Sequence, residues 1–148
     1  MDKDNVKENV LKLMKTTGEL TACYSKNCGV LKIKLMDDKE YLALNTEYKN
    51  MKPTEKKDNL LDKLNENEVL YNYNKCILKN CKNIYKNLLN IMKININTLP
   101  KTNHEYKEAN DIISELEKLM NSKKVFTKEE NKLFLKNSRN LAAIMSKI

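Results

Sequence analysis

The feature that most constrains the fold is a six-residue string that occurs twice and holds all four cysteines. The first copy reads Cys-Tyr-Ser-Lys-Asn-Cys over residues 23–28, and the second reads Cys-Ile-Leu-Lys-Asn-Cys over residues 76–81. Both copies lie in stretches whose apolar residues recur every three to four positions, which is typical of an amphipathic helix. We therefore expect an antiparallel pair of helices that is brought together through its cysteines.

Helix geometry limits how these cysteines can pair. Residues five apart in an α-helix differ by about 140° in direction and about 7.5 Å in height. Because a disulfide requires Cα atoms within about 7 Å, bridges from Cys23 to Cys28 and from Cys76 to Cys81 are not expected within intact helices. Between antiparallel helices, Cys23 would face Cys81 and Cys28 would face Cys76. The divergence of about 140° allows both pairs to meet only if the helices are locally unwound.

Three chemical states of the four cysteines remain open at this point. Cys23, Cys28, Cys76 and Cys81 are candidates for one or two inter-helix disulfides, but they could also be free thiols that pack as small hydrophobic side chains. The third alternative is a zinc site made by all four, although the C-x₄-C spacing is long for a zinc knuckle and helical continuity argues against it. The lysine inside each string favours the thiolate, which assists both oxidation and metal binding.

The chain has only two glycines and two prolines among 148 residues, which leaves few positions for the turns of a strand-rich fold. We predict an all-α fold, a bundle of about five helices in a single domain over residues 1–148. Within it we expect a first cysteine unit over 4–52, a second over 54–99 and a C-terminal helix pair over 102–148.

Two short segments have sequence patterns that do not clearly indicate a helix. Residues 30–36 alternate apolar residues with lysine, which indicates a strand, but no convincing second strand exists to pair with it. We therefore expect a helix there. Residues 94–100 are β-branched and end in proline, and we expect a connector. Capping boxes at residues 102–105 and 127–130 predict the starts of the last two helices.

The net charge of +8 raises the question of a polyanionic partner. Arg139 is the single arginine, and base-specific recognition relies mainly on arginine. What remains is non-specific binding in which lysines contact phosphates, and on the second helix Lys75, Lys79, Lys82 and Lys86 are the candidates. We hold such a nucleic-acid-binding module, with or without zinc, as the alternative function.

Enzyme signatures are absent from the sequence. Two isolated glycines cannot form a phosphate-binding loop, and the single histidine, His104, lies inside a capping box where an exposed helix start accounts for it. We expect no enzyme activity, no catalytic residue and no cofactor. A small thiol-dependent redox enzyme is a third option, and it would require an exposed cysteine with a depressed pKa.

No run of 18 or more apolar residues occurs, and the first residues are polar, so we expect neither a membrane span nor a signal peptide. The lysine, asparagine and isoleucine usage, together with the C-x₄-C pairs, resembles that of small helical minor virion (capsid) proteins of large DNA viruses with AT-rich genomes. This resemblance implies a structural or assembly protein, located in the virion or the host cytoplasm, whose partners are other protein subunits.

Overall fold

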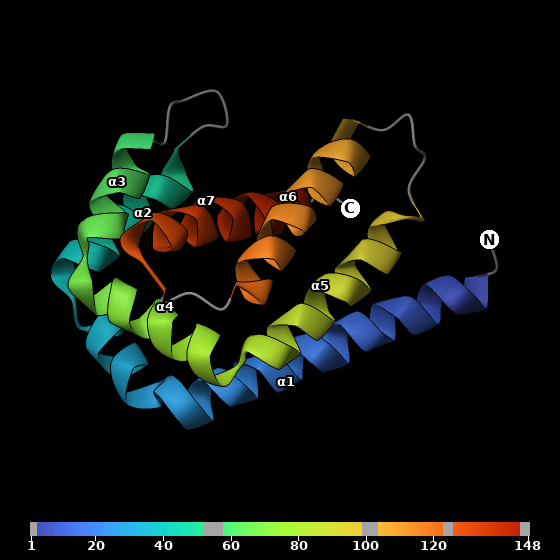
Figure 1. The fold of residues 1–148 in the computed structure, drawn as a ribbon, viewed down its shortest axis with the longest axis horizontal. Coiled ribbons are helices and arrows are strands. Elements are labelled where there is room, and N and C mark those ends of the chain that lie inside the picture. The colour runs from blue at the N-terminus through green and yellow to red at the C-terminus, as the bar shows by residue number, and fades with distance from the viewer. Residues whose placement is uncertain (1–2, 52–57, 99–103, 123–125, 146–148) are drawn as a thin grey trace.

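The computed structural model describes residues 3–51, 58–98, 104–122 and 126–145, and all regular secondary structure in these ranges is helical (Figure 1). This confirms the all-α class. The predicted number of about five helices was wrong, because the described ranges hold seven. The helices are α1 (Lys3–Met36), α2 (Lys39–Asn50), α3 (Asp58–Glu66), α4 (Glu68–Asn80), α5 (Lys82–Ile96), α6 (His104–Asn121) and α7 (Lys128–Met145).

The helix count rises because the long apolar stripe between residues 60 and 91 is interrupted twice. At the first break, the side chain of Asn67 accepts a hydrogen bond from the backbone N–H of Leu70 at 2.9 Å and thereby caps the start of α4. At the second break, Cys81 leaves the helical conformation between α4 and α5. Neither interruption removes the periodic spacing of the apolar residues, so the spacing alone does not reveal the two breaks.

Two segments with mixed sequence signals are both helical. Residues 30–36 form the last part of α1, as expected, and Leu35 in this segment is buried. The connector expected over residues 94–100 was wrong in its first half, because α5 continues through Ile96. Ile96 is fully buried in the larger hydrophobic core, and its burial offsets the weak helix propensity of a β-branched residue.

The helices are arranged around α1, which runs along the lower edge of the view in Figure 1. Helices α4 and α5 pack along one side of α1, α6 packs on α5, and α7 packs on α6 and α3 (Figure 1). The larger core contains buried residues from α1, α4, α5, α6 and α7, whereas the smaller core joins the end of α1 to α2, α3, α4 and Leu135 of α7. The three sequence segments proposed above therefore pack on shared cores.

The capping box predicted at residues 127–130 is present. The hydroxyl of Thr127 accepts a hydrogen bond from the backbone N–H of Glu130, and the carboxylate of Glu130 accepts one from the backbone N–H of Thr127, both at 3.2 Å. Of the box predicted at 102–105, residues 102 and 103 lie outside the described residues. His104 is the exposed first residue of α6. Within the described ranges, no helix has the length and apolar character needed to cross a membrane.

Candidate functional site

The cysteines are joined in two disulfides that connect α1 to the junction of α4 and α5. Cys23 is bonded to Cys81 and Cys28 to Cys76, and in both bridges the Cα atoms are 6.0 Å apart. This separation lies within the usual range for a disulfide. The order of the two bonds is the one that antiparallel helices favour, since the first cysteine of each string is bonded to the last cysteine of the other.

Local unwinding allows both bonds to form. Cys28 has backbone angles of φ −128° and ψ 17°, and Cys81 has φ −119° and ψ 15°, so the last residue of each string departs from helical geometry. At Cys28 this departure bends α1, whereas at Cys81 it separates α4 from α5. The departures turn the last cysteine of each string toward the other helix, which an unbroken helix would prevent.

The asparagine of each string holds its backbone in a matching way. The Nδ2 atom of Asn27 donates a hydrogen bond to the carbonyl oxygen of Cys23 at 3.0 Å and lies 3.3 Å from its Sγ atom. The Nδ2 atom of Asn80 makes the same contacts to Cys76, at 2.9 Å and 3.4 Å. Sequence reasoning assigned no role to these asparagines, although their four-residue distance from the first cysteine of each string was a signal for such a bond.

The two strings also contact each other crosswise. The Sγ atom of Cys23 lies 3.7 Å from the carbonyl oxygen of Asn80, and the Sγ atom of Cys76 lies 3.5 Å from the carbonyl oxygen of Asn27. A disulfide sulfur carries no proton, so these are packing contacts and not hydrogen bonds. Each of these carbonyl groups comes just before an unwound cysteine and contacts the sulfur to which that cysteine is bonded.

Burial differs within each bridge in the same way. Cys28 and Cys81 are only 2% and 1% exposed, whereas Cys23 and Cys76 are partly buried. Each disulfide thus joins one buried sulfur to one partly buried sulfur. Burial, followed by proximity to Tyr85 and Tyr73, raises the pKa of the hydroxyl group of the neighbouring Tyr24 above its ordinary value. The surroundings of the disulfides are part of the larger hydrophobic core.

A zinc site would need the same four sulfurs as thiolates, so zinc and the two disulfides exclude each other. Elsewhere in the described part of the chain, no group of three or more histidine, cysteine, aspartate or glutamate side chains could hold a metal ion. His104 is exposed at the start of α6.

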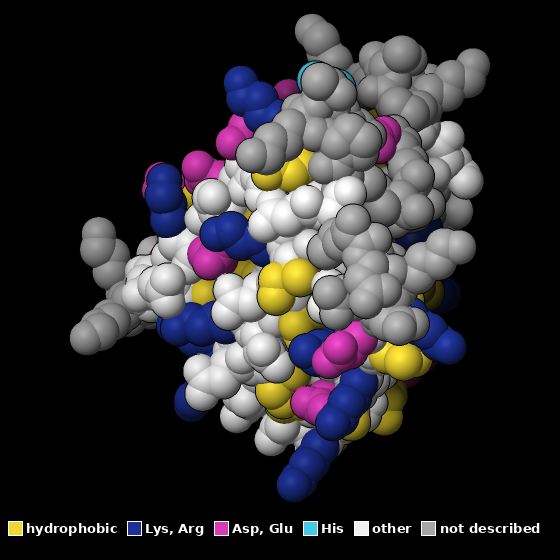
Figure 2. Space-filling view, turned by 90° about the vertical axis from the view of Figure 1, so that its right-hand side faces the viewer, with side chains coloured by type: hydrophobic (Ala, Val, Ile, Leu, Met, Phe, Trp, Pro, Cys, Tyr) yellow, Lys and Arg dark blue, Asp and Glu magenta, His cyan; other side chains and the backbone are white. Residues whose placement is uncertain are grey.

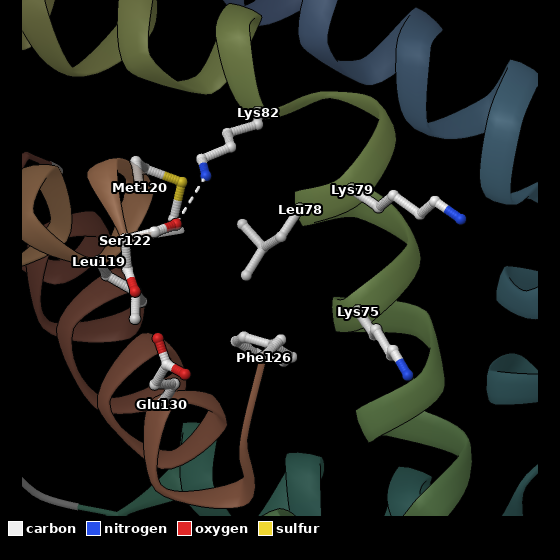
Figure 3. Close-up of a pocket in the computed structure, with 9 residues that line it drawn as sticks. All are labelled: Lys75, Leu78, Lys79, Lys82, Leu119, Met120, Ser122, Phe126 and Glu130. Atoms are coloured by element: carbon white, nitrogen blue, oxygen red, sulfur yellow. Dashed lines mark hydrogen bonds between the residues drawn. The ribbon is translucent and has the colours of Figure 1, made fainter. Parts of the chain in front are cut away.

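Three of the four lysines proposed for phosphate contacts line one hollow of about 320 Å³ between α4 and the end of α6 (Figure 3). Its apolar lining includes Leu78 and Phe126, while Lys75 and Lys79 extend from the opposite side of α4 from Leu78. The Nζ atom of Lys82 donates a hydrogen bond to the carbonyl oxygen of Ser122 at 3.1 Å. Lys86, the fourth candidate, is partly buried and is not among the residues that line this hollow.

No protein-family model, curated protein or solved structure matches the chain. The function must therefore be inferred from the geometry of the disulfides and of the surfaces around them.

Proposed function

We propose that the chain is a non-enzymatic structural or assembly protein that binds other protein subunits, and that it serves as a minor component of a virus particle. The observation that carries this proposal is the pair of disulfides that fastens the long helix α1 to the body of the bundle. The amino-acid usage that resembles minor virion proteins supports the choice of a virion.

The disulfides suit a protein that persists outside a reducing compartment. Structural disulfides are typical of oxidising settings, among them the surfaces of virus particles. The bonds here connect residues 58 and 48 positions apart, so they restrain a large part of the chain. They fix the position of α1 against α4 and α5, while the opposite side of α1 stays exposed. Such an arrangement stabilises a surface for contacts with other subunits.

The burial of the sulfurs favours a structural role over a redox enzyme. An attacking thiolate would reach the partly buried Cys23 or Cys76, and the displaced thiolate would then form at the buried Cys81 or Cys28. Burial in apolar surroundings disfavours a thiolate and makes it a poor leaving group. Catalytic disulfides instead place a stabilised, low-pKa thiolate near solvent.

The lysines around the hollow support a second candidate function, non-specific binding of nucleic acid. Lys75 and Lys79 are exposed and free to contact phosphates, but Lys82 is already hydrogen-bonded to Ser122. On the face shown in Figure 2, basic side chains are spread out and interspersed with acidic and hydrophobic ones. On this face, the described side chains do not form the continuous basic track along which a nucleic-acid backbone binds.

One experiment separates the two functions. Particles or other large assemblies are purified from the cells that naturally make this chain, treated with nuclease, and washed with up to about 1 M NaCl. We expect the protein to stay with the assemblies through both treatments, because subunit packing depends little on salt. Lysine–phosphate contacts weaken steeply with salt, so a nucleic-acid-binding module would be released.

The Lys75→Glu/Lys79→Glu variant provides the matched test, with Lys34→Glu/Lys39→Glu as the control for the change in net charge. All four lysines are exposed. An assembly protein tolerates both variants equally, whereas phosphate binding would be lost in the first alone. Absence of the protein from every large assembly would contradict the proposed function.

A further inference from the structure

Between residues 10 and 25, the outward side of α1 carries an uncharged stripe that none of the other described helices covers. We call it the outer face of α1, and its residues are Val10, Leu11, Met14, Thr17, Gly18, Thr21, Ala22 and Ser25. At 100° per residue, these positions fall within an arc of about 140° on one side of the helix. All eight are exposed, and Val10, Leu11 and Met14 are 43%, 56% and 65% exposed.

Gly18 lies at the middle of this face and is not explained by the fold of a single chain. Glycine weakens the interior of a helix relative to alanine. Gly18 does not adopt a positive φ angle, and a Cβ atom added to it would meet nothing within 4 Å. Alanine would therefore fit at this position in the monomer. A glycine that no internal contact requires is accounted for by the close approach of another backbone.

The hydroxyl groups of both threonines on the outer face of α1 already donate hydrogen bonds within the helix. The hydroxyl of Thr17 donates a hydrogen bond to the carbonyl oxygen of Leu13 at 2.7 Å, and the hydroxyl of Thr21 donates one to the carbonyl oxygen of Thr17 at 3.0 Å. Covering these side chains would leave neither hydroxyl donor without a partner, so the usual cost of burying a polar group is avoided.

We infer that the outer face of α1 binds the same face of a second copy of this chain, with the two α1 helices antiparallel and crossing near Gly18. The inference rests on the proposed assembly role and identifies its first partner. The face has a large apolar half, with Leu11 and Met14, and a small half, with Ala22 and Ser25. A twofold axis near Gly18 sets the large half of one copy against the small half of the other, which is the self-complementarity that a closed dimer requires.

The charges beside the face agree with the same alignment. Lys15 and Glu19 lie at equal distances on either side of position 17, and so do Glu8 and Lys26. In an antiparallel pair with this centre, each lysine therefore meets a glutamate of the other copy. A parallel pair in register would instead place the large side chains of the two copies against each other and would separate these charged flanks. In the antiparallel arrangement, the twofold axis that matches side-chain sizes lies near Gly18 and the axis that matches the charges lies at position 17. The two estimates of the crossing point therefore agree to about one residue.

The position of α1 leaves room for a second helix. It forms the lower edge of the molecule in Figure 1, and α4 and α5 pack on its opposite side. The two copies each carry a net charge of +8, and at about 0.15 M salt their long-range repulsion is screened beyond about 8 Å. An interface made by one helix from each copy is small, so we expect a dissociation constant on the order of 10–100 μM.

The test is sedimentation equilibrium of the oxidised protein over about 1–300 μM at physiological salt. The weight-average mass is expected to rise from the monomer value of 17.3 kDa toward twice that value. Gly18→Leu should raise the dissociation constant by about tenfold or more, because a large side chain keeps the helices apart. Gly18→Ala adds a single Cβ atom at the crossing, so its dissociation constant should lie between those of the unmodified chain and of Gly18→Leu. Both variants should retain the helical circular dichroism of the monomer.

A charge exchange tests the alignment. Lys15→Glu should weaken the dimer several-fold, and Lys15→Glu/Glu19→Lys should restore it, because opposite charges then meet again. A monomer at every concentration, or unchanged dimerisation of Gly18→Leu, would overturn the inference. A protein that is monomeric in solution but remains bound to washed assemblies would refute the dimer and leave the proposed assembly role intact. A dimer that is absent from all assemblies would refute that role alone.

Discussion

Removing both disulfides is expected to lower the free energy of unfolding by about 7 kcal/mol, while removing either one alone should cost only about 3 kcal/mol. The reason is that the bond between Cys28 and Cys76 lies inside the loop closed by Cys23 and Cys81. Whichever bond remains keeps a loop of about 50 residues closed, which restrains the unfolded chain by about 4 kcal/mol.

The second bond to form adds a much smaller ring. The two sequence separations, 58 and 48 residues, differ by 10, so the additional closure involves five residues on each strand of chain. For a ring of this size the entropic contribution is about 3 kcal/mol. Domains of this size have stabilities of about 5–15 kcal/mol, so loss of both bonds removes a large fraction of the total.

The measurement is urea unfolding of the Cys23→Ala/Cys81→Ala variant, the Cys28→Ala/Cys76→Ala variant and the four-alanine variant. Alanine avoids placing a hydroxyl group at the buried positions 28 and 81. We expect the loss in the four-alanine variant to exceed the sum of the two separate losses. Additive losses, or losses below about 1 kcal/mol, would show that the bonds do not restrain the unfolded chain in this nested way.

Replacing Asn131 by leucine is expected to lower the free energy of unfolding by about 3 kcal/mol. Asn131 is fully buried between α7 and the α3–α4 region. Its Oδ1 atom accepts a hydrogen bond from Nδ2 of Asn74 at 2.8 Å, and its own Nδ2 donates to Oδ1 of Asn65 at 2.7 Å. Leucine has a similar volume but leaves the amide of the buried Asn74 without this partner.

The companion variant Asn74→Leu/Asn131→Leu separates hydrogen bonding from packing. It removes both buried amides, so its stability should be higher than that of Asn131→Leu alone. Asn83→Leu, at an exposed position of α5, is the control and should change the stability by less than about 0.5 kcal/mol. Chemical unfolding of the three variants gives the comparison. A double variant less stable than the single one would show that the hydrogen bonds are not the source of the effect.

The sequence predicted the parts of this fold that depend on local pattern. The apolar spacing and the scarcity of glycine and proline predicted helices, and the Thr127 capping box gave the start of α7 correctly. The five-residue cysteine spacing showed that two inter-helix bonds require local unwinding, and Cys28 and Cys81 are unwound. These inferences follow from the geometry of one or two helices and need no knowledge of the remaining packing.

Polar residues with tertiary partners could not be placed in the same way. In a helical pattern an asparagine is expected to face solvent or to end a helix, and nothing local distinguishes Asn131 from Asn83. The burial of Asn131 depends on Asn65 and Asn74, which lie 66 and 57 residues away. Likewise, the spacing of Lys75, Lys79 and Lys82 placed them near one another, but only the fold brings Ser122 to the amine of Lys82.

The central claim is that Cys23 is bonded to Cys81 and Cys28 to Cys76. Tryptic mapping of the unreduced protein, with free thiols alkylated beforehand to prevent disulfide exchange, tests it directly. Lys26 and Lys79 lie between the cysteines of their strings, so cleavage separates the four cysteines into peptides 16–26, 27–32, 76–79 and 80–82. The structure predicts that 16–26 is linked to 80–82 and that 27–32 is linked to 76–79. Four unlinked peptides, with a native mass about 63 units above that of the chain, would show zinc instead. A link from 16–26 to 27–32 or to 76–79 would equally contradict the claim.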